Sequence, residues 1–319
     1  MVPKRRMVSP MRAKGSAKIT GHGGQQRYRR DDHTPNMHFS GQTLLRPLRK
    51  SQAPMKENPE HLLAADEPAP VTIYKAVAPS PLLLVADHAG NIMPRALGRL
   101  GISQAEAERH IAWDIGIAGL SRFLADALDA TLIQQNYSRL VIDCNRQPGA
   151  PTSIPEISEL TPIPGNVGLS EREKAARANA IFTPYHDRIR AELDLRKQTG
   201  RPAVLIALHS FTPVFKGESR PWHVALLYNR DPRLARCLLT LLRRENELVV
   251  GNNEPYFVSD WTDYTIPVHG ERRGLLHALI EVRQDLIADE RGQRAWALLF
   301  ARLLPHAYRV TLAGRAGPA

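Results

Sequence analysis

Short apolar runs alternate with longer amphipathic segments through most of this chain, beginning near residue 71. Strands that alternate with helices in this way form sheets that helices cover on both faces. The pattern therefore predicts an α/β fold, a three-layer αβα sandwich with a mostly parallel or mixed central sheet. The runs that we predict to be strands are residues 82–86, 130–134, 140–144, 203–208, 224–228 and 276–282.

Two pairs of residues match the capping box that opens a helix, Ser103 with Glu106 and Ser170 with Glu173. We expect the first helix to run to about residue 127 with a bend near Gly116, and the second to run toward residue 197. Residues 232–246 and 292–304 are also predicted to be helical. Residues 147–166 contain five prolines and are predicted to form a long loop.

The first 65 residues differ in composition from the rest of the chain. Residues 1–55 hold 12 Lys/Arg and two Asp, a net charge of +10, whereas the remaining residues hold 31 basic and 30 acidic side chains, a net charge of +1. Such a polar segment buries too little apolar surface to fold. We predict a disordered basic extension over residues 1–65, or translation from an upstream start when the true start is Met55, followed by a catalytic domain over residues 66–319.

Composition also limits the function classes. The basic extension leaves open a nucleic-acid binder, but its aromatics are few, and no nucleic acid is expected on the folded domain. A membrane span is excluded because no window approaches 18 consecutive apolar residues. Cys144 and Cys237 are the only cysteines, which excludes a disulfide framework and a four-cysteine zinc site. We expect a cytoplasmic protein.

Four of the predicted strands end in polar residues. The strand ends carry two histidines, two arginines, two asparagines and a glutamate, in the segments Asp87–Asn91, 143–146, 209–211 and 281–285. Since the carboxyl ends of parallel strands meet at one edge of a sheet, these side chains are expected to form one site. Two imidazoles with one carboxylate can hold Zn²⁺, and a separate glutamate can take a proton from water. An Arg–Asn pair suits a substrate carboxylate.

Six segments, taken in order, resemble the N-formylglutamate amidohydrolase family. They are residues 87–91 (DHAGN), 110–116 (HIAWDIG), 137–146 (YSRLVIDCNR), 184–186 (PYH), 208–211 (LHSF) and 280–283 (IEVR). The resemblance covers roughly residues 70–308 and implies a fold similar to that of the zinc carboxypeptidases. It also implies a zinc-dependent hydrolase whose partner is a small N-acyl amino acid, with N-formyl-L-glutamate as the expected substrate. The same site would also suit another N-acyl amino acid.

The resemblance also assigns roles to single residues. His88 and His209 match metal ligands, Glu281 matches the catalytic glutamate, and Asn145 with Arg146 matches a pair that binds a substrate carboxylate. Carboxypeptidases place a glutamate three residues after the first histidine, and here that position is Asn91. The third ligand therefore stays open between Asp114, the preferred candidate, and Asn91. A second hypothesis is that the protein has this fold but has lost the metal site.

The remaining candidate residues could either take part in the reaction or have a structural role. His186 is a candidate for orienting substrate, and Tyr256 for a hydrogen bond to the scissile carbonyl oxygen. Arg139 is a candidate for substrate binding or for pairing with Asp143, which is interpreted as orienting Arg146. Asp87 is expected to point away from His88, its neighbour, because alternate side chains of a strand face opposite ways. On the same argument, Cys144 is expected to pack in the core.

Overall fold

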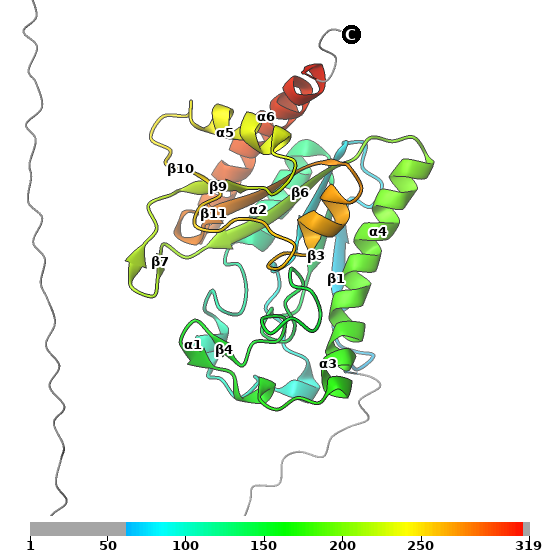
Figure 1. Cartoon of the computed structure of the whole chain (residues 1–319), viewed down its shortest axis with the longest axis vertical. Helices are drawn as coiled ribbons and strands as arrows, with labels where there is room; N and C mark the ends of the chain where they lie inside the picture. The colour runs from blue at the N-terminus through cyan, green and yellow to red at the C-terminus, as the bar shows by residue number, and fades with distance from the viewer. Residues whose placement is uncertain (1–61, 315–319) are drawn as a thin grey trace, which may run out of the picture. The chain divides into compact units, whose positions relative to one another are not determined.

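The computed structural model describes residues 62–314, so nearly all of the predicted basic extension lies outside the described residues. The described chain is built on a seven-stranded sheet in the order β1-β3-β2-β6-β11-β9-β10 (Figure 1). The strands are β1 (Val71–Tyr74), β2 (Leu82–Ala86), β3 (Thr131–Gln135), β6 (Val204–Phe211), β9 (Val224–Leu227), β10 (Val250–Asn252) and β11 (Leu276–Arg283).

The sheet is mixed and mostly parallel, as the sequence predicts. Strands β3, β2, β6 and β11 are neighbours and all run parallel. Strand β1 is antiparallel to β3, and β9 is antiparallel to β11 and parallel to β10. The carboxyl ends of the four central strands therefore lie along one edge of the sheet, where His88 follows β2 and where His209 and Glu281 lie near the ends of β6 and β11.

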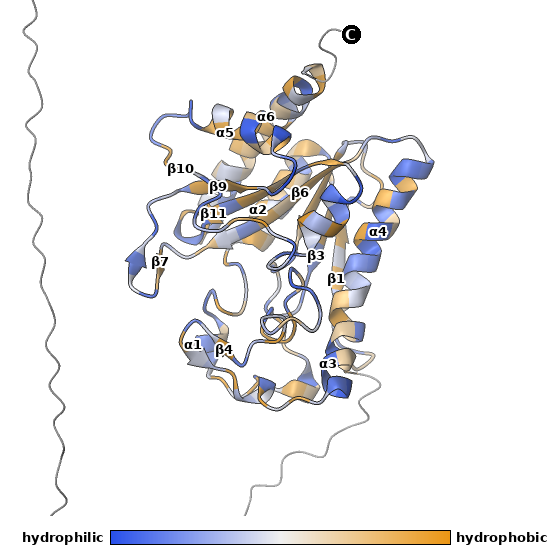
Figure 2. Ribbon diagram, viewed as in Figure 1, coloured by the Kyte–Doolittle hydropathy of each residue, from blue (hydrophilic) through white to orange (hydrophobic). Residues whose placement is uncertain are grey.

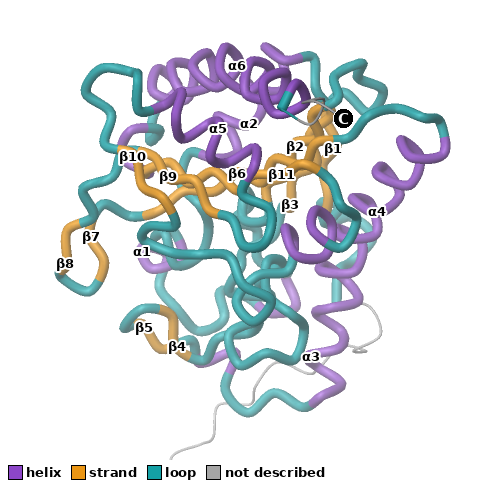
Figure 3. Tube along the Cα trace, turned by 45° about the horizontal axis from the view of Figure 1, so that its top comes forward, coloured by secondary structure: helices purple, strands orange, loops and turns teal. Residues whose placement is uncertain are grey.

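Helices cover the sheet on both faces, and this confirms the three-layer arrangement. On one face lie α2 (Ile117–Leu128), α5 (Arg233–Leu242) and α6 (Glu290–Ala313), and on the other lies α4 (Thr183–Gln198) together with long loops (Figure 3). Strand β2 supplies Leu82 and Leu84 to the first face and Leu83 and Val85 to the second. Because both faces are covered, the central strands are buried along almost their whole length, and most of their residues are apolar (Figure 2).

The remaining elements are short. They are α1 (Gln104–Ala107), α3 (Glu171–Arg177), the π-helical segments at Ala178–Phe182 and Ile266–Glu271, single 3-10 turns at Arg95–Leu97, Pro164–Asn166 and Gln284–Leu286, and the two-residue strands β4 (Ile157–Ser158), β5 (Thr161–Pro162), β7 (Val214–Phe215) and β8 (Glu218–Ser219). None of the helices in residues 62–314 is long and apolar enough to cross a membrane.

Two predicted elements are wrong. The helix expected from Ser103 to residue 127 is broken, because residues 108–116 form turns between α1 and α2. Gly116 has a φ of +83°, which a helix interior does not accept. Residues 140–144 are turns rather than a strand, since the amide of Asp143 bonds to the Ser153 carbonyl and not to a neighbouring strand. Their apolar side chains are nevertheless buried, which explains the strand-like pattern.

The second capping box is confirmed. The Ser170 side chain accepts a hydrogen bond from the Glu173 amide, and the Glu173 carboxylate accepts one from the Ser170 amide. The helical segments α3, Ala178–Phe182 and α4 follow without a break, as predicted. The proline-rich segment 147–166 is mainly loop, and α6 begins near its predicted start but continues to Ala313, past Pro305.

Candidate active site at the carboxyl edge of the sheet

Three of the predicted functional residues lie at neighbouring strand ends. His88 follows β2, His209 lies in β6, and Glu281 lies in β11. His209 and Glu281 are register partners in the parallel β6–β11 pair, so their side chains face the same side of the sheet. The rings of His88 and His209 are 5.0 Å apart and nearly perpendicular. All three residues line a cavity of about 510 Å³.

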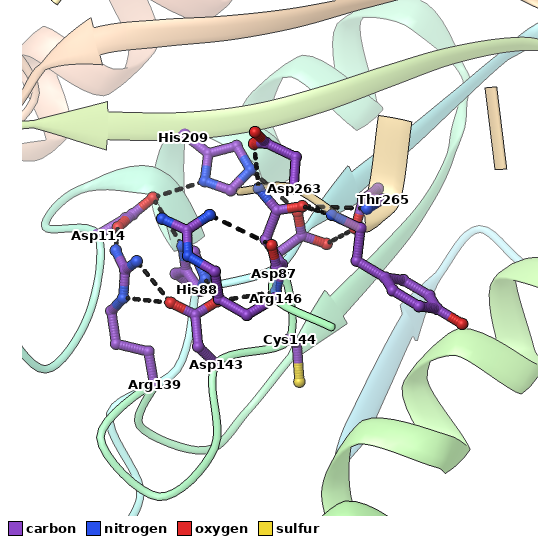
Figure 4. Close-up of polar contacts among 12 residues, drawn as sticks. Asp87, His88, Asp114, Arg139, Asp143, Cys144, Arg146, His209, Asp263 and Thr265 are labelled. Atoms are coloured by element: carbon purple, nitrogen blue, oxygen red, sulfur yellow. Dashed lines mark hydrogen bonds and ion pairs between the residues drawn. The ribbon is translucent and has the colours of Figure 1, made fainter. Parts of the chain in front are cut away.

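Asp114 completes a buried cluster with the two histidines. One potential ligand atom from each of His88, Asp114 and His209 lies within 4.8 Å of the other two, so the three residues could hold a metal ion (Figure 4). The Asp114 carboxylate lies 3.0 Å from His209 Nδ1 and 3.5 Å from His88 Nδ1. Asn91 instead donates a hydrogen bond to the Ala107 carbonyl. Between the two candidates left open by the sequence, the geometry favours Asp114.

The turns at residues 108–116 bring Asp114 to this place. Its backbone amide donates a hydrogen bond to the His88 carbonyl, and the Ser210 amide donates one to its side chain. Asp114 is therefore tied to both histidine-bearing segments. It lies before α2 rather than within a continuous helix.

Two further aspartates hold the outer nitrogens of the histidine rings. His88 Nε2 lies 2.8 Å from Asp143 Oδ1, and His209 Nε2 lies 3.0 Å from Asp87 Oδ2. When the rings are neutral and both Nε2 atoms donate, as they would beside a bound metal ion, both Nδ1 atoms are acceptors on the side of Asp114. Carboxylates in this position fix the ring orientation and the tautomer of metal-binding histidines.

The role of Asp87 differs from the one that strand alternation predicted. Strand β2 ends at Ala86, so Asp87 and His88 lie in a turn where alternation no longer applies. The side chain of Asp87 lies outside the three-residue cluster, but it bonds to His209 rather than pointing away from the site. Its other oxygen accepts hydrogen bonds from the hydroxyls of Tyr185 and Thr265.

The interpretation of Asp143 also changes. Its carboxylate binds His88 and receives two hydrogen bonds from Arg139, whereas Arg146 donates to the Asn145 carbonyl. Arg139 also lies 3.4 Å from Asp114, so it bridges two carboxylates of the site (Figure 4). The pairing of Arg139 with Asp143 that the sequence suggested is therefore present.

The charges of this site are those of a cation-binding centre. Burial alone would lower the pKa of His209, yet the Asp114 and Asp87 carboxylates raise it well above its usual value. Burial would raise the pKa of Asp114, but the two histidines hold it below its usual range. The site thus favours a positive charge between the carboxylates and the imidazoles.

The donor set fits a metal ion. His88 Nδ1 is buried and has no hydrogen-bond partner among the described residues, although it faces the Asp114 carboxylate. Two imidazole nitrogens and one carboxylate oxygen form a three-residue ligand set that leaves a coordination position open. A divalent cation would give the unpartnered nitrogen a ligand bond in place of a missing hydrogen bond.

Glu281 has the environment of a general base. Its side chain is 8% exposed, and its Oε2 atom has no hydrogen-bond partner among the described residues. Burial, as the largest effect, raises the pKa of Glu281 to about 7. A carboxylate with such a pKa exchanges protons near neutral pH.

Comparison with known proteins matches this architecture to one family. The family model described as N-formylglutamate amidohydrolase matches residues 80–288, which contain all the residues of the cluster and Glu281. The chain belongs to the N-formylglutamate amidohydrolase family. No curated protein matches the sequence significantly.

Two solved structures are similar to this amidohydrolase. The gene product Atu2144 from Agrobacterium tumefaciens is 38% identical, with a TM-score of 0.76 over 78% of this chain and 98% of that one. The N-formylglutamate amidohydrolase from Ralstonia eutropha JMP134 is 19% identical, with a TM-score of 0.54 over 76% of this chain and 99% of that one. At 19% identity, the similarity to the Ralstonia eutropha structure concerns the fold alone.

The predicted substrate-binding residues of the amidohydrolase divide into two groups. Arg146, Asn145, Arg139 and Tyr256 line the cavity, but His186 does not. Arg146 makes fewer hydrogen bonds than Arg139, since within residues 62–314 its guanidinium donates only a 3.3 Å hydrogen bond to the neighbouring Asn145 carbonyl. Asn145 is instead engaged by the loop at 263–265, because its amide donates to Asp263 and accepts from the amides of Tyr264 and Thr265.

His186 and Cys144 lie behind the cavity. His186 Nε2 donates a hydrogen bond to the Cys144 carbonyl, and Nδ1 accepts one from His269 Nε2. Burial lowers the pKa of His186 to about 4, so it is neutral at pH 7. Burial raises the pKa of the Cys144 thiol well above its usual value, and this removes it as a nucleophile.

Proposed function

We propose that this protein hydrolyses the amide bond of N-formyl-L-glutamate, giving formate and L-glutamate, with Zn²⁺ as its cofactor. One observation carries the proposal: the buried cluster of His88, Asp114 and His209 lies beside Glu281 in a chain of the N-formylglutamate amidohydrolase family. A zinc ion held by these three ligands would polarise the formyl carbonyl as a Lewis acid.

In this mechanism Glu281 moves the proton. Its carboxylate takes a proton from the attacking water, whose oxygen forms the new bond to the formyl carbon. When the C–N bond breaks, Glu281 returns the proton to the leaving nitrogen, so that formate and the free amine of glutamate result. The pKa of Glu281, about 7, suits both transfers.

The other residues position the substrate and the ligands. Arg146 binds a carboxylate of the substrate through charge-assisted hydrogen bonds. Tyr256 lines the cavity and donates its hydroxyl toward the scissile carbonyl oxygen in this proposal. Asp87 and Asp143 keep His209 and His88 in orientation, and Arg139 holds Asp143 in turn.

Formate release from N-formyl-L-glutamate tests the reaction and the base together. We expect zinc-dependent turnover, and we expect Glu281→Gln to lower kcat by at least about 100-fold while zinc remains bound. Glu218→Gln is the matched control, because Glu218 is an exposed carboxylate on β8. Equal turnover by wild type and Glu281→Gln would remove Glu281 from the mechanism.

A different N-acyl amino acid is the second candidate substrate. The cavity of about 510 Å³ falls in the range that encloses drug-sized ligands, and it exceeds what a formyl group and glutamate require. Absence of turnover of N-formyl-L-glutamate by the zinc-loaded protein, with turnover of a larger N-acyl amino acid, would select this candidate.

A further inference from the structure

Arg220 lies directly after the β7–β8 hairpin, between two aromatic rings of the cavity wall. Its guanidinium carbon is 4.5 Å from the centre of the Phe215 ring and 4.8 Å from the centre of the Tyr256 ring. Phe215 and Tyr256 both line the cavity. No motif in the sequence indicates a role for this arginine.

The charge of Arg220 is buried and has no anionic partner in residues 62–314. The residue is 7% exposed, and its Nη1 atom is buried without a hydrogen-bond partner. Its backbone amide donates a hydrogen bond to the Pro213 carbonyl, and its guanidinium interacts with the hydroxyl of Tyr256, which is a neutral partner and not an anion. Two aromatic faces attract a cation, but more weakly than a carboxylate does.

Other buried arginines of this protein are used differently. Arg196 is fully buried and donates to the Glu192 carboxylate and to backbone carbonyls. Arg177 is buried and donates to the Asn166 side chain and to two backbone carbonyls. Buried charges in proteins are normally paired, because an unpaired charge loses its hydration without compensation. Arg220 therefore lacks the anionic partner that would compensate for the lost hydration of its buried guanidinium.

The positive charge of Arg220 also acts on the cavity. Burial, as the main cause, lowers the pKa of His110, and the charge of Arg220 adds to this lowering. His110 lines the same cavity as Phe215, Tyr256 and Arg146. The charge of Arg220, which lies against the wall residues Phe215 and Tyr256, thus adds to those of Arg139 and Arg146 in attracting an anionic group into this cavity.

We propose that Arg220 binds the side-chain carboxylate of the substrate and so selects acidic N-acyl amino acids, while Arg146 binds the α-carboxylate. The inference rests on the proposed function, because it assigns the two carboxylates of one substrate to two arginines. The rings of Phe215 and Tyr256 hold the guanidinium plane in place for a forked pair of hydrogen bonds.

The test compares N-formyl-L-glutamate with N-formyl-L-glutamine, whose side chain is nearly isosteric and uncharged. We expect the wild type to favour glutamate by at least about tenfold in kcat/KM, and Arg220→Gln to abolish this preference through a higher KM for glutamate alone. Arg146→Gln should instead raise the KM for both substrates. The proposal would be overturned if Arg220→Gln kept the preference for N-formyl-L-glutamate over N-formyl-L-glutamine, or if the wild type lacked this preference.

Binding of glutarate, measured by calorimetry on the full chain, separates this inference from the proposed function. If neither formyl substrate is turned over, the proposed function fails, and the inference stands only if Arg220→Gln weakens glutarate at least about tenfold while butyrate binding is unchanged. Equal glutarate affinity in both proteins, or no glutarate binding to the wild type, would refute it.

Two further variants guard against a folding defect. Arg220→Lys retains the charge and is expected to keep part of the preference for glutamate. Arg294→Gln removes a similar stacking of a guanidinium on an aromatic ring, that of Phe123, away from the cavity and should leave both measurements unchanged.

Discussion

At the scale of single residues, the four carboxylates of the site have distinct environments. Asp114 faces both histidine Nδ1 atoms, Asp87 and Asp143 each hold one Nε2 atom, and Glu281 alone has an oxygen free of hydrogen bonds among the described residues. The same functional group is therefore used as a candidate ligand, as an orienting partner and as a candidate base. The difference comes from which atoms lie within hydrogen-bond distance.

The orienting role of Asp87 can be measured by zinc affinity. We expect Asp87→Asn to weaken zinc binding by about 10–100-fold, because the amide no longer fixes the tautomer and ring plane of His209. Competition with a chelator measures the affinity. Asp285→Asn serves as the control, since Asp285 pairs with Arg283 at an exposed position. Unchanged zinc affinity in Asp87→Asn would show that the hydrogen bond to His209 does not support the metal site.

At the scale of elements, the turns at residues 108–116 decide where Asp114 lies. They link α1 to α2 and end at Gly116, whose φ is +83°. A Cβ atom at Gly116 would lie 2.1 Å from the Ile287 carbonyl oxygen, so this position requires glycine for space as well as for conformation. The position of a candidate ligand thus depends on a contact with a segment far along the chain.

Gly116→Ala tests this dependence. We expect a loss of unfolding free energy larger by at least about 2 kcal/mol than in Gly200→Ala, and a loss of zinc as well. Gly200 also has a positive φ, of +68°, but a Cβ atom there would meet nothing within 4 Å. It therefore isolates the backbone strain from the steric clash. Chemical denaturation and zinc content give the two readings, and equal losses in both variants would contradict the argument.

At the scale of the whole molecule, the packed core imposes a pH dependence on stability. Burial lowers the pKa of His186 from 6.5 to about 4, whereas the unfolded chain takes up the proton near 6.5. The unfolded state therefore binds more protons between these values, so the folded state loses stability as the pH falls from about 6.5 to 4. The contribution is of order 3 kcal/mol for a shift of this size.

His186→Gln removes this titration. Glutamine can donate to the Cys144 carbonyl as His186 Nε2 does, so we expect the variant to be less stable than wild type at pH 7 but to lose less stability on acidification. Urea denaturation at pH 7 and pH 4 measures the difference in unfolding free energy. His306→Gln is the control, because His306 is exposed on α6. Parallel pH profiles for wild type and His186→Gln would contradict a buried neutral imidazole.

Whether zinc binding and formate release require the basic segment, residues 1–54, also concerns the whole molecule. We expect a variant that starts at Met55 to retain zinc content and formate release, because residues 80–288 contain the family match and the site. Nucleic-acid binding by the full chain, if present, should be steeply salt-dependent and absent from the variant. Loss of formate release on removal of residues 1–54 would assign these residues a part in the fold or the reaction.

The sequence by itself determined the central strands of the sheet and the placement of three candidate site residues at their carboxyl ends. Apolar runs buried on both faces predicted β2, β6 and β11, and the polar residues after or near the ends of these runs predicted His88, His209 and Glu281. These inferences succeed because strand position and register depend on local patterns of hydrophobicity. The strand expected at residues 140–144 failed because a buried loop can be as apolar as a strand.

Only the tertiary structure decided what the loops do. Asp114 lies beside the histidines rather than within a helix, and Asp87 bonds to His209. Arg220 lies between Phe215 and Tyr256 without an anionic partner among the described residues. Each of these positions depends on contacts between segments far apart in the sequence. A turn leaves no periodic pattern from which such contacts can be predicted, so hydrophobic periodicity specifies the sheet but not the side chains that its loops bring together.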